Sequence, residues 1–447
     1  MRSSSLGRAV IVQFATLALV GCSTTTGGGS GSGGASGGEP SQAGASGTSS
    51  IAGAGNGGAP ATGGAPPITG CDGGQTSGMG GTDGSMTVTL LGTGSPIPSP
   101  DRFGPSTLVE AAGVRLVFDV GRGAPIRLWQ KQIPLGSINA HFLTHLHSDH
   151  VNGLPDLWMS GWIQTAFGSR KTPFVLYGPD GTQAMMTSLW DAFSEDRRIR
   201  LDDEMNPIAG IEFEVHDVPP GLVYCQNGVA VSTFDVDHGD LVKPARGYKI
   251  SYGAHTVVLS GDTRYSTNVE QAATGADLLV HEVAMIPTAL IDKYPAYAAI
   301  LAHHITPEDA GKLFAVAQPK LAVYSHVVLS GLPSEGIPFP TPADVLAATK
   351  TTYSGPVIVG SDQMAFRIDA SGVAMVVAAA GSGGAGMAGA AGATASMGGL
   401  GGMGGLGGMS GPGGMSGTSG AGGTSAAGAS GTGGLGGMSG TAGGGGI

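Results

Sequence analysis

The middle of the chain alternates short apolar runs with polar and glycine-rich breaks, which is the pattern of buried β-strands joined by turns. Some runs are apolar throughout, as at 278–280, and others alternate apolar with polar positions, as at 229–236. The runs predict strands at residues 88–91, 107–110, 114–118, 138–143, 174–177, 211–218, 229–236, 247–252, 256–260, 278–280, 321–324, 357–359 and 373–377.

Stretches with helical spacing lie between these strands, at 156–166, 182–193 and 306–317. Two β-rich halves with helices between them predict two sheets packed face to face and covered outside by helices. The expected fold is therefore of the α/β class, an αββα sandwich.

Composition divides the chain into a folded middle and two low-complexity flanks. Residues 23–85 and 378–447 consist largely of Gly, Ala, Ser, Thr and Met, with very few charges. Such sequence cannot bury enough apolar surface to fold, so we expect a disordered Gly/Ser-rich linker at 23–85 and a disordered tail at 378–447. The hydrolase domain described below is expected at 86–377. The chain carries a net charge of −11, which makes a nucleic-acid partner unlikely because phosphate binding usually needs a basic excess.

Residues 1–22 have the pattern of a secretion signal. Arg2 and Arg8 precede an apolar stretch, broken only by Gln13, that is too short to span a bilayer comfortably. The stretch ends in Leu19-Val20-Gly21-Cys22, which resembles a bacterial lipoprotein cleavage box. The resemblance implies that Cys22 is lipidated and anchors the exported protein to the membrane. Serine rather than aspartate follows the cysteine, which favours the outer membrane.

Two further cysteines, Cys71 and Cys225, lie in the linker and in the domain. Disulfides persist in exported proteins, so these two cysteines could pair. The sequence alone leaves open whether they do.

The candidate chemistry is concentrated in His145-Leu146-His147-Ser148-Asp149-His150, which follows the predicted strand at 138–143. Histidines are scarce, at 11 in 447 residues, yet three of them and a carboxylate fall within these six positions. Imidazole and carboxylate groups suit Zn²⁺ and related ions. A loop at the carboxyl end of a strand is also where open α/β sheets place their chemistry.

Three more candidate ligands follow predicted strands elsewhere in the chain. His238 comes after the strand at 229–236, Asp262 after that at 256–260, and His326 after that at 321–324. The recurrence predicts that they join the histidine cluster.

These residues together resemble the metallo-β-lactamase superfamily. The His-x-His-x-Asp-His string matches its signature, and the later positions resemble the branch that contains ribonuclease Z and the arylsulfatase-like hydrolases. Further matching segments are Leu91-Gly92-Thr93-Gly94, Gly178-Pro179-Asp180-Gly181-Thr182, Gly247-Tyr248, Leu279-Val280-His281-Glu282 and His304-Ile305-Thr306.

The resemblance implies a ligand set for two Zn²⁺ ions, with Mn²⁺ or iron as alternatives. One ion takes His145, His147 and His238, the other takes Asp149, His150 and His326, and Asp262 bridges them. Two such ions can share one hydroxide, which acts as the nucleophile.

Other residues are expected to assist the metals. Asp149 could orient the hydroxide, while His304 could protonate the leaving oxygen, with His303 as a fallback. Asp119 is expected to hold a ligand imidazole by its other nitrogen, and Glu282 to orient His304.

The leading functional hypothesis is a binuclear zinc hydrolase of small sulfate or phosphate esters. Segments 160–162, 192–198 and 236–239 resemble arylsulfatase-like members, and the expected partner is a small anionic ester, with Arg197, Arg198 and Arg264 as candidate contacts.

The alternatives are a ribonuclease Z-like phosphodiesterase, a lactonase or β-lactamase, and, least favoured, a non-catalytic surface module. Ribonuclease Z commonly carries a glycine- and lysine-rich arm for tRNA soon after the segment that matches Gly247-Tyr248. Here only residues 251–255 separate two predicted strands, which counts against tRNA.

The lipoprotein hypothesis predicts the effect of Cys22→Ala. Without the thiol no lipid can be attached, so the variant should leave the membrane fraction or accumulate unprocessed. Cell fractionation and the mass of the mature N-terminus measure this. A Cys22→Ala variant that fractionates and is processed like the parent would disprove the lipid anchor.

Overall fold

The computed structural model describes Cys71 and residues 84–376. The expected signal peptide at 1–22 with Cys22, nearly all of the linker at 23–85 and the tail at 378–447 lie outside the described residues.

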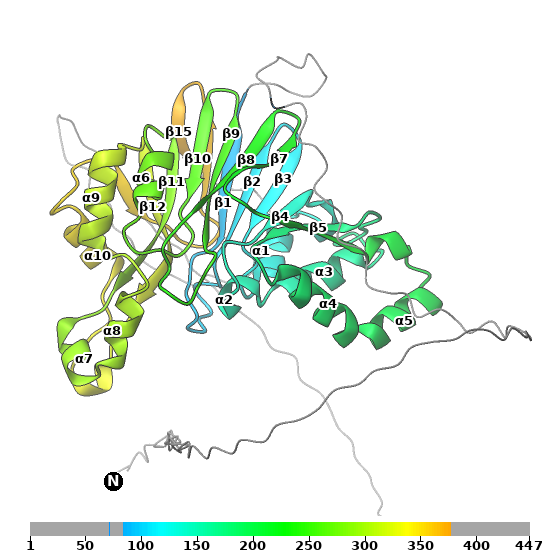
Figure 1. Ribbon diagram of the computed structural model, residues 1–447, viewed down its shortest axis with the longest axis horizontal. Coiled ribbons are helices and arrows are strands. Elements are labelled where there is room, and N and C mark those ends of the chain that lie inside the picture. Colours follow the sequence, from blue (N-terminus) through cyan, green and yellow to red (C-terminus); the bar gives the residue numbers. More distant parts are fainter. Residues whose placement is uncertain (1–70, 72–83, 377–447) are drawn as a thin grey trace, which may run out of the picture. The chain divides into compact units, whose positions relative to one another are not determined.

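Two sheets lie side by side with helices on their outer faces (Figure 1). The first sheet has eight strands in the order β15-β14-β1-β2-β3-β4-β5-β6. Their bounds are β1 (Met86–Gly92), β2 (Ser106–Ala111), β3 (Val114–Phe118), β4 (Ala140–Phe142), β5 (Phe174–Gly178), β6 (Phe213–Asp217), β14 (Ala365–Asp369) and β15 (Gly372–Val376).

The second sheet has seven strands in the order β13-β12-β11-β10-β9-β8-β7. Their bounds are β7 (Gly221–Gln226), β8 (Val229–Asp235), β9 (Arg246–Tyr252), β10 (His255–Leu259), β11 (Leu278–Met285), β12 (Leu321–Leu329) and β13 (Val357–Val359). Strands β10 to β13 run parallel to one another.

The apolar runs of the sequence arise because many strands are buried on both faces. In β3, Leu116 and Phe118 lie in the core between the sheets, while Val117 faces the helices. In β11, Val280 faces the other sheet and Leu279 faces the helices. Each strand therefore contributes alternately to an inner and an outer apolar layer.

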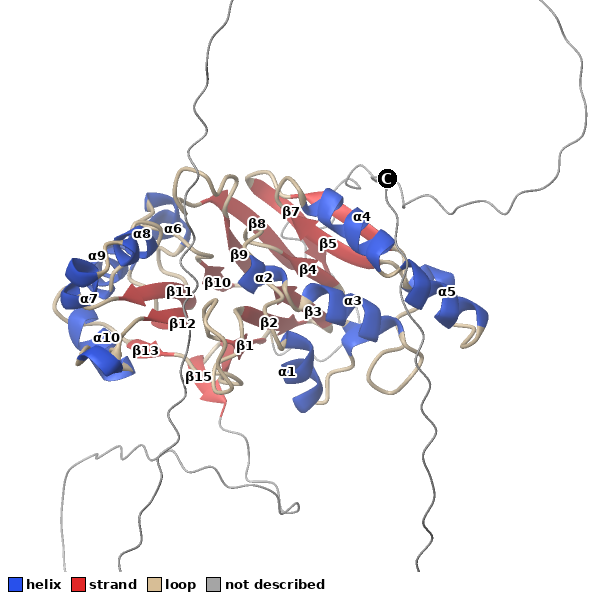
Figure 2. Cartoon of the chain, turned by 90° about the horizontal axis from the view of Figure 1, so that it is seen from below, coloured by secondary structure: helices blue, strands red, loops and turns tan. Residues whose placement is uncertain are grey.

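The helices fall into two groups, one on each outer face (Figures 1 and 2). On the first sheet, Leu128, Trp158 and Met186 of three helices pack into one apolar cluster; on the second, Phe314 and Val345 pack into another. The helices are α1 (Ala124–Gln130), α2 (Ser148–Val151), α3 (Leu154–Trp162), α4 (Thr182–Ala192), α5 (Ser194–Asp202), α6 (Thr267–Ala272), α7 (Thr288–Lys293), α8 (Ala296–Leu301), α9 (Pro307–Ala317) and α10 (Pro342–Thr349).

The predicted αββα sandwich is confirmed, but several elements were missed or misplaced. The helix predicted at 156–166 is α3, which starts earlier because Pro155 fits its first turn, and stops at Trp162 because Ile163 is extended. The missed elements are mostly short, or, like α5, bury none of their residues, so they leave no apolar periodicity in the sequence.

Cys71 and Cys225 form a disulfide that ties residue 71 to strand β7. The bond joins positions 154 residues apart, so it attaches the segment before the domain to an edge of the second sheet. Among the described residues, no helix has the length and apolar character needed to cross a bilayer.

Candidate metal centre

The histidine-rich segment lies where β4 ends and α2 begins, between the two sheets at one end of the sandwich (Figure 2). His145 and His147 occupy the loop, and α2 carries Asp149 and His150. The backbone at Gly121 lies directly against α2. A Cβ at Gly121 would sit 2.7 Å from the carbonyl oxygen of Asp149, so only glycine allows this approach.

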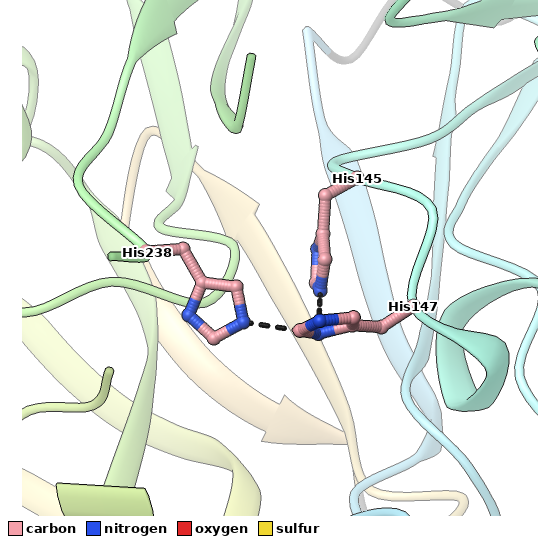
Figure 3. A group of neighbouring side chains, drawn as sticks. All are labelled: His145, His147 and His238. Atoms are coloured by element: carbon pink, nitrogen blue, oxygen red, sulfur yellow. Dashed lines mark hydrogen bonds between the residues drawn. The ribbon is translucent and has the colours of Figure 1, made fainter. Parts of the chain in front are cut away.

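The first triad consists of His145, His147 and His238 (Figure 3). The Nδ1 atom of His147 lies 2.9 Å from Nε2 of His145 and 3.1 Å from Nε2 of His238. His238 comes from the loop after β8, in the other sheet. Three ring nitrogens thus converge from two sheets, in the arrangement that a single metal ion requires.

The second triad consists of Asp149, His150 and His326. The Nε2 atom of His326 lies 3.1 Å from Oδ2 of Asp149, and Nε2 of His150 lies 3.6 Å from the same oxygen. All three side chains are buried, whereas His147 of the first triad is exposed. The site therefore opens to solvent on the side of His147.

Asp262 lies between the two triads. Its Oδ2 atom is 3.2 Å from Nε2 of both His150 and His326, and 3.9 Å and 3.8 Å from Nε2 of His145 and His238. One carboxylate oxygen thus faces both groups, which is the position expected for a bridging ligand.

The prediction that His326 follows the end of its strand is wrong, because β12 continues to Leu329. His326 instead occupies an irregularity in the β11–β12 pairing, where the register shifts between His281 and Val283. Its backbone has a φ of 44°, in the left-handed region. The interruption of the ladder, rather than a strand end, turns this imidazole toward the site.

Burial keeps most of the first triad neutral. It lowers the pKa of His238 to about 4, and it lowers the pKa of His145 well below the usual range, helped by the neighbouring His150. Neutral imidazoles have free lone pairs for a metal.

The second group is paired electrostatically instead. Although burial opposes both shifts, Asp262 and Asp119 raise the pKa of His150, and His326 and His150 lower the pKa of Asp262. Asp262 Oδ1 is buried and has no hydrogen-bond partner among the described residues. Ionised carboxylates and convergent ring nitrogens fit two transition-metal ions, which would neutralise this buried charge.

Solved structures of similar shape include a metallo-β-lactamase-fold protein from Bacillus subtilis, with a TM-score of 0.48 and 17% identity over 63% of this chain and 99% of that one. The short form of human tRNase Z has a TM-score of 0.45 and 23% identity over 62% of this chain and 98% of that one. The family model of the anti-Pycsar protein Apyc1 matches residues 86–294.

Curated relatives are more similar in sequence. A ribonuclease Z from Mycobacterium marinum is 35% identical over 245 residues, covering 54% of this chain and 86% of the relative. A ribonuclease Z from Mycobacterium sp. strain KMS is 33% identical over 279 residues, covering 62% of this chain and 94% of the relative. The chain belongs to the ribonuclease Z family. It is accordingly a metal-dependent hydrolase with the metallo-β-lactamase fold.

In this member of the ribonuclease Z family, the protein also holds the second nitrogen of several imidazoles. Asp119 Oδ2 lies 2.8 Å from Nδ1 of His150, as its predicted role requires. The carbonyl of His303 lies 2.9 Å from Nδ1 of His238. Thr144, which the sequence analysis missed, places its hydroxyl 3.0 Å from Nδ1 of His145. Such contacts set which nitrogen faces the metal.

His304 lies beside the triads and is held by Glu282, as predicted. Its Nδ1 atom is 3.2 Å from Glu282 Oε2, and its ring stacks on His326 with centroids 5.5 Å apart. Glu282 also accepts a hydrogen bond from the backbone of Ile305. Despite burial, Glu282 raises the pKa of His304 to about 9, so this imidazole carries a proton at neutral pH.

The candidate substrate arginines are engaged elsewhere. Arg197 packs on the ring of Trp190, and Arg198 pairs with Glu195 and Asp202 on α5, which lies at the outer end of the molecule away from α2 (Figures 1 and 2). Arg264 pairs with Asp237, next to His238. Of the three, Arg264 alone stands near the site.

The geometry predicts that Asp262→Ala loses metal. Metal-replete wild type should hold about two transition-metal ions per chain, and the variant should hold fewer because both sites share this carboxylate. Elemental analysis after removal of free metal measures the content. Asp240→Ala removes an exposed carboxylate from the loop after β8 and should keep the wild-type content. Full occupancy in Asp262→Ala would rule out the bridge.

Proposed function

We propose that this protein is a binuclear metal-dependent phosphodiesterase, with zinc in both sites and Mn²⁺ or iron as alternatives. The observation that carries the proposal is the position of Asp262, one oxygen of which faces both triads. The ribonuclease Z relatives support a phosphodiester as the bond that is cleaved.

The metals, when bound, would polarise the phosphoryl oxygens and lower the pKa of water. The chain's own residues divide the remaining work. Asp149 is ionised, because contacts with His326 and His150 lower its pKa despite burial, so it can accept a hydrogen bond from the attacking water. Protonated His304, held by Glu282, can donate a proton to the leaving oxygen.

The substrate proposed is a small phosphodiester rather than tRNA. Only Gly253 and Ala254 separate β9 from β10, so the described chain has no arm at the position where ribonuclease Z commonly carries one. The net charge of −11 also disfavours a long polyanion.

Sulfate-ester hydrolysis, as in arylsulfatase-like enzymes, would use the same site, because a sulfate ester presents similar anionic oxygens. No contact of the described residues favours sulfate, and the relatives favour phosphodiesters. Lactone and β-lactam hydrolysis remain controls for the assay.

We further propose that the domain acts outside the cytoplasm, lipid-anchored through Cys22 and most plausibly at the outer membrane. The Cys71–Cys225 disulfide supports export, because such bonds are rare in reducing compartments.

A substrate panel tests the function. The metal-replete protein should hydrolyse small aryl phosphodiesters faster than aryl sulfates, lactones or β-lactams, and Asp262→Ala should lose that activity. Release of the nitrophenolate or ring opening is followed by absorbance. Faster turnover of aryl sulfate than of the phosphodiester would replace this proposal with the sulfatase alternative.

His304→Ala should separate proton transfer from metal binding. The variant should keep its metals but hydrolyse esters with poor leaving groups about 10²–10⁴-fold more slowly, with little effect on nitrophenyl esters. Wild-type rates on poor leaving groups should fall as the pH rises through about 9, because His304 then loses its proton, and the variant should lack this fall.

His303→Ala is the matched control, since its imidazole is the exposed neighbour of His304. If His303→Ala gives the selective loss and His304→Ala does not, the acid is assigned to the wrong histidine. If His304→Ala strips a metal, His304 is a ligand.

A further inference from the structure

Among the buried histidines of the two triads, His326 stands apart in how its second nitrogen is held. Contacts within the protein hold Nδ1 of His145, His150 and His238. The Nδ1 atom of His326 is buried and has no hydrogen-bond partner among the described residues. A metal ligand with a free second nitrogen can turn about its side-chain bonds, so something else must hold this ring.

A small cavity lies directly beneath the triads. Its volume is about 40 Å³, and residues of both sheets line it, including Ser106, Val280, His281 and His326. All of the lining residues except Gly261 are buried. A water molecule needs roughly 10–15 Å³ of such space, so the cavity can hold two or three.

Three buried atoms of the lining residues lack hydrogen-bond partners: Nδ1 of His326, Nε2 of His281 and Oδ1 of Asp262. His281 is 0% exposed, and its Nδ1 donates to the carbonyl of Glu282 at 2.8 Å. Burial lowers the pKa of His281, so the ring is neutral and its Nε2 atom can only accept.

The three atoms comprise one donor and two acceptors once His326 turns Nε2 to a metal. That choice leaves a proton on Nδ1 of His326, while His281 Nε2 and Asp262 Oδ1 each accept. One water molecule offers one lone pair to the donor and two protons to the acceptors. Ordered buried waters typically make about three hydrogen bonds of this kind.

We propose that an ordered water in this cavity links His326 to His281, which makes His281 a positioning residue for the second metal site. The inference rests on the proposed metal-binding role of His326. The water accepts from Nδ1 of His326 and donates to His281, and thereby keeps Nε2 of His326 directed at the ion.

Metal affinity of His281 variants tests the link. His281→Leu removes the acceptor, and its affinity for one of the two ions should fall about 10–100-fold, the effect usual for losing such a contact. His281→Gln places an amide oxygen close to the position of Nε2 and should retain wild-type affinity. Competition with a chromophoric chelator, titrated with Zn²⁺, measures both sites separately.

His141→Leu is the matched control. His141 is also a buried histidine with an unpartnered Nε2, but it stacks on Phe174 and does not line the cavity. Its affinity for both ions should match that of wild type, and thermal unfolding of the metal-free proteins reports any general damage.

Wild-type affinity in His281→Leu, or equal losses in His281→Leu and His281→Gln, would overturn the proposal. If the variants fail to fold, a high-resolution crystal structure of the zinc-loaded wild type decides. Water within hydrogen-bond distance of the three atoms supports the link, and a dry cavity refutes it. A wild type that binds fewer than two zinc ions would instead count against the proposed function.

Discussion

The buried carboxylate of Asp262 is the constraint on which the site depends. Its side chain is 3% exposed and faces imidazoles from both triads. A charge taken out of water is costly unless cations or hydrogen bonds compensate it. Ligands from both sheets, together with two bound cations, meet that requirement, so packing of the sandwich and binding of metal are coupled.

The same constraint explains the irregular backbone around the site. Regular β11–β12 pairing would continue past His326, yet the ladder is interrupted there and the residue adopts a positive φ. On the other sheet, Gly121 allows the loop after β3 to lie against α2. These deviations from regular structure are stored where side chains must converge, and the two well-packed apolar layers around them maintain the geometry.

Outside the metal groups, the chain has features that suit a small substrate and an external location. The tight β9–β10 turn leaves no arm for a large nucleic acid, and the disulfide links the segment before the domain to β7. Both features lie away from the reacting groups. A common hydrolase site can thus be adapted by its loops and its attachment, without change in the ligands.

The sequence by itself determined the sandwich and the candidate ligands, because both depend on local patterns. Apolar runs mark strands buried on both faces, and six residues from His145 to His150 place four ligand groups on one loop. It did not determine the short helices, the strand that continues through His326 or the disulfide. Thr144, and the cavity beside His281, also escaped notice, because their significance lies in neighbours more than a hundred residues away. Distances between such residues exist only once the two sheets pack, so the tertiary structure alone decided which nitrogens are held and which are not.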